Sequence, residues 1–173
     1  MKLIIFGSTG SIGRPLVRQA LEQGHAVTAF ARDPSKLDIS HENLKTLQGD
    51  ALDLPSVEQA VQGHDAVLCS LGAGAKGTVR TQGTQNIVRA MEKAGVRRFI
   101  CQSSLGVGDS WDNLSFFWKY IMFRGLLRQA YEDHAGQEEC VRQSALDWTI
   151  VRPAAFTDGD RTGDYRHGFP PDD

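Results

Sequence analysis

The stretch Leu3-Ile4-Ile5-Phe6-Gly7-Ser8-Thr9-Gly10-Ser11-Ile12-Gly13 decides the fold class. It opens with a short apolar run, which predicts a buried strand. Glycines then stand at every third position and lead into a segment with helical periodicity. At such a junction the first glycine permits a tight turn, the second lets the backbone approach a pyrophosphate, and the third lets the helix pack closely. The stretch therefore predicts a strand–turn–helix unit that holds a phosphate group.

The hydrogen-bond donors for that phosphate are expected to come from the loop itself. Backbone N–H groups in the first turn of a helix have no partner within the helix, and the helix dipole favours an anion there. The hydroxyl groups of Ser8, Thr9 and Ser11 can add further donors. The predicted binding segment consists of Gly7, Ser8, Thr9, Gly10, Ser11, Ile12 and Gly13. A glycine-rich turn without a ligand is the alternative.

Strand-like and helix-like segments alternate through the rest of the chain. Strands are expected at residues 3–6, 26–31, 44–48, 66–70, 98–102 and 148–151. Helices are expected at residues 11–23, 55–62, 79–94 and 114–143, with a short helix capped by Asp33 between the second and third strands. This alternation predicts an α/β fold with a doubly wound parallel sheet of about six strands in the order 3-2-1-4-5-6.

Length and composition limit the protein classes that remain. The chain has 173 residues, 40% hydrophobic and 23% charged, with a formal net charge of −2. These values favour a single domain over residues 1–173, with an irregular tail at 153–173, and predict no nucleic-acid partner. The cysteines and histidines are scattered without the spacing of a metal site. No signal peptide or transmembrane segment is predicted, so the cytoplasm is the expected location.

The residue after the second strand indicates which dinucleotide the loop prefers. An acidic residue about 20 positions past the glycines would bind the ribose 2′-hydroxyl of NAD. Arg32 stands there instead, and Lys36 follows one helical turn later. A guanidinium group matches the geometry of a 2′-phosphate, so NADP is predicted over NAD. The alternative is that Arg32 and Lys36 form a solvated face.

Two further stretches follow predicted strands and are candidates for cofactor contacts. Asp50, Ala51 and Leu52 follow the third strand, where they could meet the adenine, and Ser70, Leu71 and Gly72 follow the fourth, beside the cofactor ribose. Ligands of such sheets bind at the carboxyl ends of the strands, which is where both stretches fall.

Several segments together resemble one branch of the atypical short-chain dehydrogenases, the NmrA-like and biliverdin reductase B (flavin reductase)-like NAD(P)H-binding proteins. The matching segments are FGSTGSIG, ARDPSKL, GDALD, TQNIVRAMEKAGVRRFICQSS and SALDWTIVRPAAFTDG, which cover most of the chain up to about Arg161. The resemblance implies a Rossmann-like fold and an NADPH-dependent reductase of a flavin, quinone or similar small planar acceptor. It equally allows a non-catalytic NAD(P)-sensing regulator, or a nucleotide-binding scaffold or assembly factor.

The resemblance also implies roles for individual residues. Ser104, next to Ser103, matches the family serine beside the nicotinamide, His134 matches a histidine that could donate a proton, and Pro153 matches a position whose backbone lies near the nicotinamide. The alternatives are that the serines simply end a strand and that His134 is an exposed helical residue. The Tyr-x-x-x-Lys pair of the wider family is absent, since Arg124 follows Tyr120 and Ala135 follows Tyr131 at that spacing.

The segment at 115–131, SFFWKYIMFRGLLRQAY, is apolar on more than one side, with basic residues between the aromatic ones. Such a helix needs more than one partner surface. Core packing with a lid over the substrate pocket, an oligomer or protein interface, and contact with a membrane surface are all compatible with it. Relatives of this type run on past the end of this chain, so the tail at 153–173 is expected to be either a natural short form or a truncated substrate-side region.

Overall fold

The computed structural model describes residues 1–72, 78–154, 156, 163 and 168. A single six-stranded sheet lies at its centre, with every strand pair parallel and the order β3-β2-β1-β4-β5-β6. The strands are β1 (Lys2–Phe6), β2 (Ala26–Ala31), β3 (Leu44–Gln48), β4 (Ala66–Cys69), β5 (Arg98–Gln102) and β6 (Asp147–Val151). The predicted fold class and strand order are therefore confirmed.

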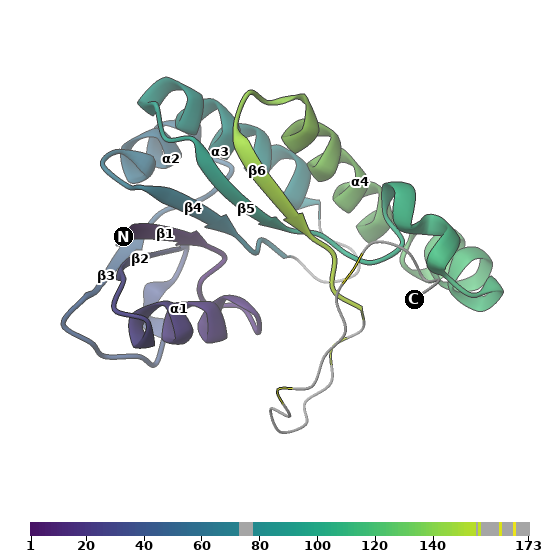
Figure 1. Cartoon of the computed structure of the whole chain (residues 1–173), viewed down its shortest axis with the longest axis horizontal. Coiled ribbons are helices and arrows are strands. Elements are labelled where there is room, and N and C mark those ends of the chain that lie inside the picture. The colour runs from purple at the N-terminus through teal and green to yellow at the C-terminus, as the bar shows by residue number, and fades with distance from the viewer. Residues whose placement is uncertain (73–77, 155, 157–162, 164–167, 169–173) are drawn as a thin grey trace.

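Helices cover the two faces of the sheet unequally. They are α1 (Gly13–Glu22), η1 (Pro34–Lys36), α2 (Leu54–Val61), α3 (Val79–Ala94), η3 (Gly108–Asn113), η4 (Phe117–Leu126) and α4 (Arg128–Gln143). Figure 1 shows α2, α3 and α4 along one face and α1 on the other. Each face has its own apolar core: Ile4, Phe99 and Met91 belong to the larger one, and Ile5 and Val17 to the one beneath α1. The alternation of side chains along each strand separates the two cores.

Local sequence signals account for most helix ends. Gly24, Gly63 and Gly95 have positive φ angles of 78°, 75° and 72° and follow α1, α2 and α3, as expected for residues that end helices. The Asp33 side chain accepts a hydrogen bond from the backbone N–H of Ser35 at 3.2 Å and caps η1, as predicted.

The helical stretch expected over residues 114–143 is helical from residue 116 to 143 except at Leu127, but it is not one regular α-helix. The structure divides this stretch into η4, which is wound as a π-helix, and α4, with Leu127 between them at φ −106° and ψ 14°. An aromatic cluster of Trp111, Phe123 and Tyr131 packs at the junction, with ring centroids 5.4 to 6.5 Å apart. Packing of these rings, rather than helical periodicity, sets the path of the chain here. Most of the predicted tail at 153–173 lies outside the described residues.

Candidate functional site

A cavity of about 910 Å³ lies along the carboxyl ends of the strands. This size is at the upper end of the roughly 300–1,000 Å³ typical of small-molecule sites. Its lining contains fifteen of the predicted site residues: Gly7, Thr9, Gly10, Ser11, Ile12, Arg32, Asp50, Ala51, Ser70, Leu71, Gly72, Ser103, Ser104, His134 and Pro153. Ser8, Gly13, Lys36 and Leu52 do not line it. The fold thus brings together residues that follow all six strands, with His134 from α4.

The glycine loop is packed so tightly that side chains would not fit. Gly7 has a φ angle of 79°, and a Cβ atom there would lie 2.4 Å from the carbonyl oxygen of Ser70. A Cβ atom on Gly13 would lie 2.1 Å from the carbonyl oxygen of Gly7. The third glycine therefore lets α1 approach the loop itself. Gly10 has more room, since the nearest atom to its Cβ position is the carbonyl oxygen of Gly7 at 3.2 Å.

The N-terminus of α1 is open for an anion. Within the described residues no side chain caps this helix, and its first turn holds no acidic residue. Ser11 and Ile12, which directly precede this helix, line the cavity, so a ligand there would lie next to the positive end of the helix dipole. Ser8 has another role than the predicted one, because its buried hydroxyl donates a hydrogen bond to the carbonyl oxygen of Phe30 at 3.0 Å. That bond ties the loop to β2 and uses the hydroxyl proton.

The two basic residues after β2 differ in position. Arg32 is exposed and lines the cavity at the end of β2. Lys36 lies outside the lining, and its ammonium group is 3.6 Å from the carboxylate of Asp33, with 66% of its side chain exposed. Of the predicted pair, only Arg32 is therefore in place to contact a ligand in the cavity.

The stretch after β3 forms a compact turn beside the cavity. The Asp50 carboxylate accepts a hydrogen bond from the backbone N–H of Leu52 at 3.0 Å, and Leu52 itself points away from the cavity lining. The amide of Asn86 donates a hydrogen bond to the carbonyl oxygen of Ala51 at 2.9 Å. These two hydrogen bonds hold Asp50 and Ala51 at the rim of the cavity.

A buried ion pair that the sequence did not reveal forms one wall. The Asp133 carboxylate on α4 accepts hydrogen bonds from the backbone N–H groups of Arg80 and Thr81, at 3.0 and 2.9 Å, and from the Arg80 guanidinium at 3.3 Å. It thereby caps α3 from a neighbouring helix. Arg80 lines the cavity, and its buried Nε atom has no hydrogen-bond partner among the described residues.

His134 lies next to this pair and is neither exposed nor charged near neutral pH. Burial lowers its pKa to about 4, and the nearby Arg80 guanidinium adds to the effect. Its Nδ1 atom is buried without a hydrogen-bond partner among the described residues. A neutral imidazole can donate or accept a hydrogen bond to a ligand, but it cannot serve as the imidazolium acid that the sequence suggested.

The ends of β5 and β6 place Ser103, Ser104 and Pro153 together on the cavity lining. The N–H of Ser103 donates to the carbonyl oxygen of Val151 at 2.8 Å, and the N–H of Leu105 donates to that of Pro153 at 3.0 Å. The Ser103 hydroxyl is buried and has no hydrogen-bond partner in the described part of the chain. The two strand ends therefore continue pairing into the site.

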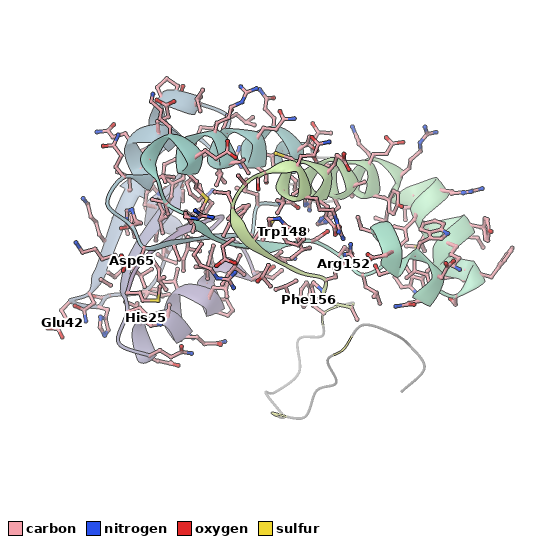
Figure 2. The ribbon with its side chains drawn as sticks, turned by 45° about the horizontal axis from the view of Figure 1, so that its top comes forward. His25, Glu42, Asp65, Trp148, Arg152 and Phe156 are labelled. Atoms are coloured by element: carbon pink, nitrogen blue, oxygen red, sulfur yellow. The ribbon has the colours of Figure 1, made fainter. Side chains whose placement is uncertain are left out.

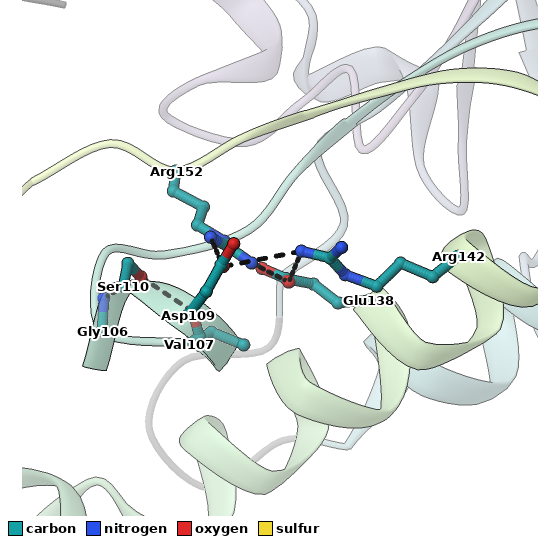
Figure 3. A network of polar contacts seen from close by, with 7 residues as sticks. All are labelled: Gly106, Val107, Asp109, Ser110, Glu138, Arg142 and Arg152. Atoms are coloured by element: carbon teal, nitrogen blue, oxygen red, sulfur yellow. Dashed lines mark hydrogen bonds and ion pairs between the residues drawn. The ribbon is translucent and has the colours of Figure 1, made fainter. Parts of the chain in front are cut away.

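A charged network behind these strand ends fixes the backbone before Pro153. Figure 3 shows Arg152 between Glu138 on α4 and Asp109 on η3. Two nitrogen atoms of Arg152 donate to the two carboxylate oxygens of Glu138 at 2.8 and 2.6 Å, and a third donates to Asp109. The hydrogen bonds from Arg152 lower the pKa of the Asp109 carboxyl. Burial is the largest single influence on Glu138 and would raise its pKa, but the hydrogen bonds and positive charge of Arg152, together with smaller contributions that include the charge of Arg142, lower the pKa overall.

Aromatic and aliphatic side chains form the wall opposite the glycine loop. They are Leu114, Trp118, Phe123, Leu127 and Phe156. Figure 2 shows Arg152 and Phe156 near the middle of the molecule, with His25 and Asp65 toward one end. Neither Tyr120 nor Tyr131 lines the cavity.

Sequence reasoning missed several lining residues. The residues that were not predicted as part of the site are Phe30, Ala31, Gly49, Val79, Arg80, Gln102, Leu105, Asn113, Leu114, Ser115, Ala154 and Phe156. The position of Gly49 just after the third strand was an available signal. Arg80 gave none, because a basic residue near the start of a helix is usually exposed.

The residues present fit a dinucleotide. Gly7 and Gly13 leave a cradle that a Cβ atom would fill, the uncapped N-terminus of α1 suits a pyrophosphate, and Arg32 suits a phosphate at the far rim. The buried, unpartnered polar atoms of Arg80, Ser103 and His134 also suit a polar ligand, because such atoms are normally satisfied.

Comparison with solved structures finds the same fold in other proteins. The oxidoreductase ylbE from Lactococcus lactis superimposes with a TM-score of 0.83 at 26% identity, over 94% of this chain and 73% of that one. ChuY from Escherichia coli O157:H7, described as an anaerobilin reductase, gives a TM-score of 0.76 at 27% identity, over 94% of this chain and 77% of that one.

Curated relatives differ in length and in function. The UPF0659 protein YMR090W of Saccharomyces cerevisiae is 30% identical over 94% of this chain and 73% of its own length. The photosystem II assembly factor Ycf39 of Synechocystis is 28% identical over 92% of this chain, which spans only 46% of that relative. A 3β-hydroxysteroid dehydrogenase/isomerase of Mycobacterium tuberculosis is 36% identical over 61% of this chain, and the match covers 32% of that enzyme.

A family profile described as NAD(P)H-binding matches residues 7–173. It begins at Gly7, the first residue of the glycine loop, and includes every cavity-lining residue described above. With the fold, the cradle and the relatives in agreement, the chain belongs to this NAD(P)H-binding family.

Proposed function

We propose that the protein is an NADPH-dependent reductase of a small planar acceptor such as a flavin, a quinone or a conjugated pigment. The observation that carries the proposal is the continuity of the cavity from the glycine loop to the aromatic wall. The first part suits a dinucleotide, and the second suits a flat, largely apolar ring system. The reductase ChuY among the structural neighbours supports this reaction class.

The preference for NADPH rests on Arg32. It follows β2, at the place where NAD-binding proteins of this fold carry an acidic residue, and it lines the cavity. A guanidinium group there attracts a 2′-phosphate and does not match a free 2′-hydroxyl as a carboxylate would.

When bound, NADPH supplies a hydride, and the chain has to position the acceptor and exclude water. Ser104 lies at the end of β5, where its hydroxyl donates to the carbonyl oxygen of Leu105 at 3.3 Å and can turn to donate instead to a carbonyl or ring nitrogen of the acceptor. His134 is neutral at pH 7, so it orients the acceptor by hydrogen bonding. The proton that accompanies the hydride then comes from solvent, which suits flavins and quinones.

A non-catalytic, NAD(P)-sensing role is the competing proposal. It is favoured by the absence of Tyr120 and Tyr131 from the cavity lining, since neither of these two tyrosines, the ones in the described part of the chain, is in place to act as the acid/base of the tyrosine mechanism. A scaffold or assembly role is the third candidate, since the relative Ycf39 is described as a photosystem II assembly factor.

The test is NADPH oxidation, followed at 340 nm, against a panel of flavins and short-chain quinones. We expect turnover with at least one planar acceptor and a lower rate when NADH replaces NADPH. Ser104→Ala should lower kcat with that acceptor by roughly 5- to 10-fold, the value of one hydrogen bond. Tight NADPH binding without turnover on any acceptor would reject the reductase and favour the sensor.

A further inference from the structure

The π-helix η4 carries a stripe of exposed apolar side chains. Phe116, Ile121 and Leu126 are 73%, 52% and 76% exposed, and Phe117 and Tyr120 beside them are about half exposed. Figure 1 shows this part of the chain, just before α4, at the end of the molecule away from α1 and β3. So many large apolar side chains together on a surface mark an interaction site.

The winding of η4 separates this stripe from the cavity wall. In a π-helix the hydrogen bonds run between residues five apart, so residues at that spacing lie near one another along the helix. Phe116, Ile121 and Leu126 share one such row, and Trp118 and Phe123 share another, with ring centroids 6.0 Å apart. Trp118 and Phe123 line the cavity. One helix therefore presents one apolar row to solvent and another to the ligand.

The segment that carries the stripe holds three cations, two of which pair with flanking carboxylates. Residues 114–131 contain Lys119, Arg124 and Arg128 and no acidic residue, in a chain whose net charge is −2. Lys119 and Arg128 are paired with Asp112 and Glu132, which flank this segment. The Arg124 guanidinium lies 5.0 Å from the ring centre of Tyr120, at the edge of the stripe. Aromatic side chains with a cation beside them are typical of helices that lie in a membrane interface.

We propose that the stripe Phe116–Ile121–Leu126 docks on the surface of a lipid bilayer with anionic headgroups, and that the acceptor is a conjugated molecule dissolved in that bilayer. The second part rests on the proposed reductase function. The acceptor would pass from the bilayer over the edge of η4 to the wall formed by Trp118 and Phe123. A quinone with a long apolar tail has this chemistry.

A bilayer fits the stripe better than a second copy of the chain does. Five exposed side chains form the stripe and its margin, about 60% exposed on average at roughly 200 Å² each, and they present on the order of 600 Å²; they are Phe116, Phe117, Tyr120, Ile121 and Leu126. A stable dimer buries about 800 Å² per partner over a complementary surface. Among the described residues no helix is long and apolar enough to cross a membrane, so η4 would lie on the bilayer and not span it.

Flotation with vesicles of phosphatidylcholine and phosphatidylglycerol tests the docking. We expect the full chain to float with vesicles that contain the anionic lipid and to float less with pure phosphatidylcholine. The double variant Ile121→Ser/Leu126→Ser should lower the bound fraction at least tenfold, while Val151→Ser, at a 47% exposed position on β6, should not change it. Arg124→Gln should reduce the difference between the two vesicle types.

Activity separates this inference from the proposed function. With a short, water-soluble quinone the double variant should turn over like the wild type, and with a long-tailed quinone in vesicles it should lose most of its rate. Absence of flotation by the wild type, with turnover of the soluble quinone intact, would overturn the docking and leave the reductase standing. Self-association of the wild type that the double variant abolishes, without flotation, would assign the stripe to a second copy.

Discussion

The Asp133 carboxylate joins three parts of the site. It binds the first backbone N–H groups of α3, pairs with Arg80, and precedes His134 on α4. Because Arg80 and His134 both line the cavity, the shape of the wall depends on this one carboxylate. This ion pair could not be predicted from the sequence, since Arg80 and Asp133 lie 53 positions apart and neither residue type is unusual in a helix.

Arg32 is the residue that tests the choice of cofactor. Arg32→Asp should weaken NADPH binding by roughly 10- to 100-fold, because charge-assisted hydrogen bonds to a phosphate contribute about 1.5–3 kcal/mol. Binding of NADH should change much less. Dissociation constants from the fluorescence of the bound nucleotides measure both.

Lys36→Gln is the matched control for this change. Lys36 is engaged with Asp33 outside the cavity, so its removal should alter NADPH affinity less than about threefold, as for an exposed ion pair. An unchanged ratio of NADPH to NADH affinity in the Arg32 variant would show that the guanidinium does not bind the 2′-phosphate.

The lowered pKa of His134 predicts a measurable dependence of the unfolding free energy on pH. Its pKa is about 4 in the folded chain, below the ordinary value of 6.5, so the unfolded chain takes up the proton first as pH falls. The stabilisation is present above about pH 6.5 and is lost as the pH falls toward 4. Between pH 7 and 5 the wild type should lose about 2 kcal/mol more unfolding free energy than His134→Gln.

Urea unfolding at several pH values between 7 and 5 provides this comparison. The other histidines are common to both proteins, so their contributions cancel in the difference. If the free energy of unfolding changes equally with pH in the wild type and the variant, His134 keeps its ordinary pKa and is open to water.

The glycine loop is the element on which cofactor binding depends. Gly13→Ala would place a Cβ atom 2.1 Å from the carbonyl oxygen of Gly7, so the loop must shift and NADPH binding should fall at least tenfold. Gly125→Ala is the control, because no atom lies within 4 Å of its Cβ position. Circular dichroism checks that both variants fold. Wild-type affinity in a folded Gly13→Ala chain would argue against the loop as the phosphate site.

The ion pair at the end of β6 tests how the strand ends are held together. Arg152→Met would leave the Glu138 carboxylate buried, with only Arg142 within reach at 3.8 Å. Removing one partner of a buried pair costs about 3–5 kcal/mol, whereas an exposed pair contributes less than about 1 kcal/mol. Arg98→Met, which removes a partner of the exposed Asp147, should therefore be mild.

Urea unfolding of the two arginine variants measures the difference in their free energies of unfolding. Equal, small losses would mean that the contacts of Arg152 do not hold β6 to α4 and η3.

At the scale of the whole molecule, periodicity and glycines predicted the sheet well. Most strands contain a short apolar run, and glycines with positive φ end three helices, so the order of elements could be predicted along the chain. Contacts between distant segments could not be predicted in this way. Ser8 turned out to bond Phe30, and the π-winding of η4 depends on aromatic packing with Trp111 and Tyr131.

More of the lining residues were predicted in the cofactor half of the cavity than in the acceptor half. The loop, Arg32 and the residues after β3 and β4 follow strands directly, and parallel strands bring their carboxyl ends together. The acceptor wall comes from η4, its neighbouring loops and Phe156, which no strand pattern aligns.

A single-turnover reaction tests the central claim most directly. The protein is mixed with NADPH that carries deuterium at one or the other C4 position, and then with the planar acceptor identified in the panel. A reductase that holds the nicotinamide in one orientation should oxidise one deuterated form more slowly than unlabelled NADPH and the other form at the normal rate. Tight binding of NADPH with no oxidation of either form would contradict the account.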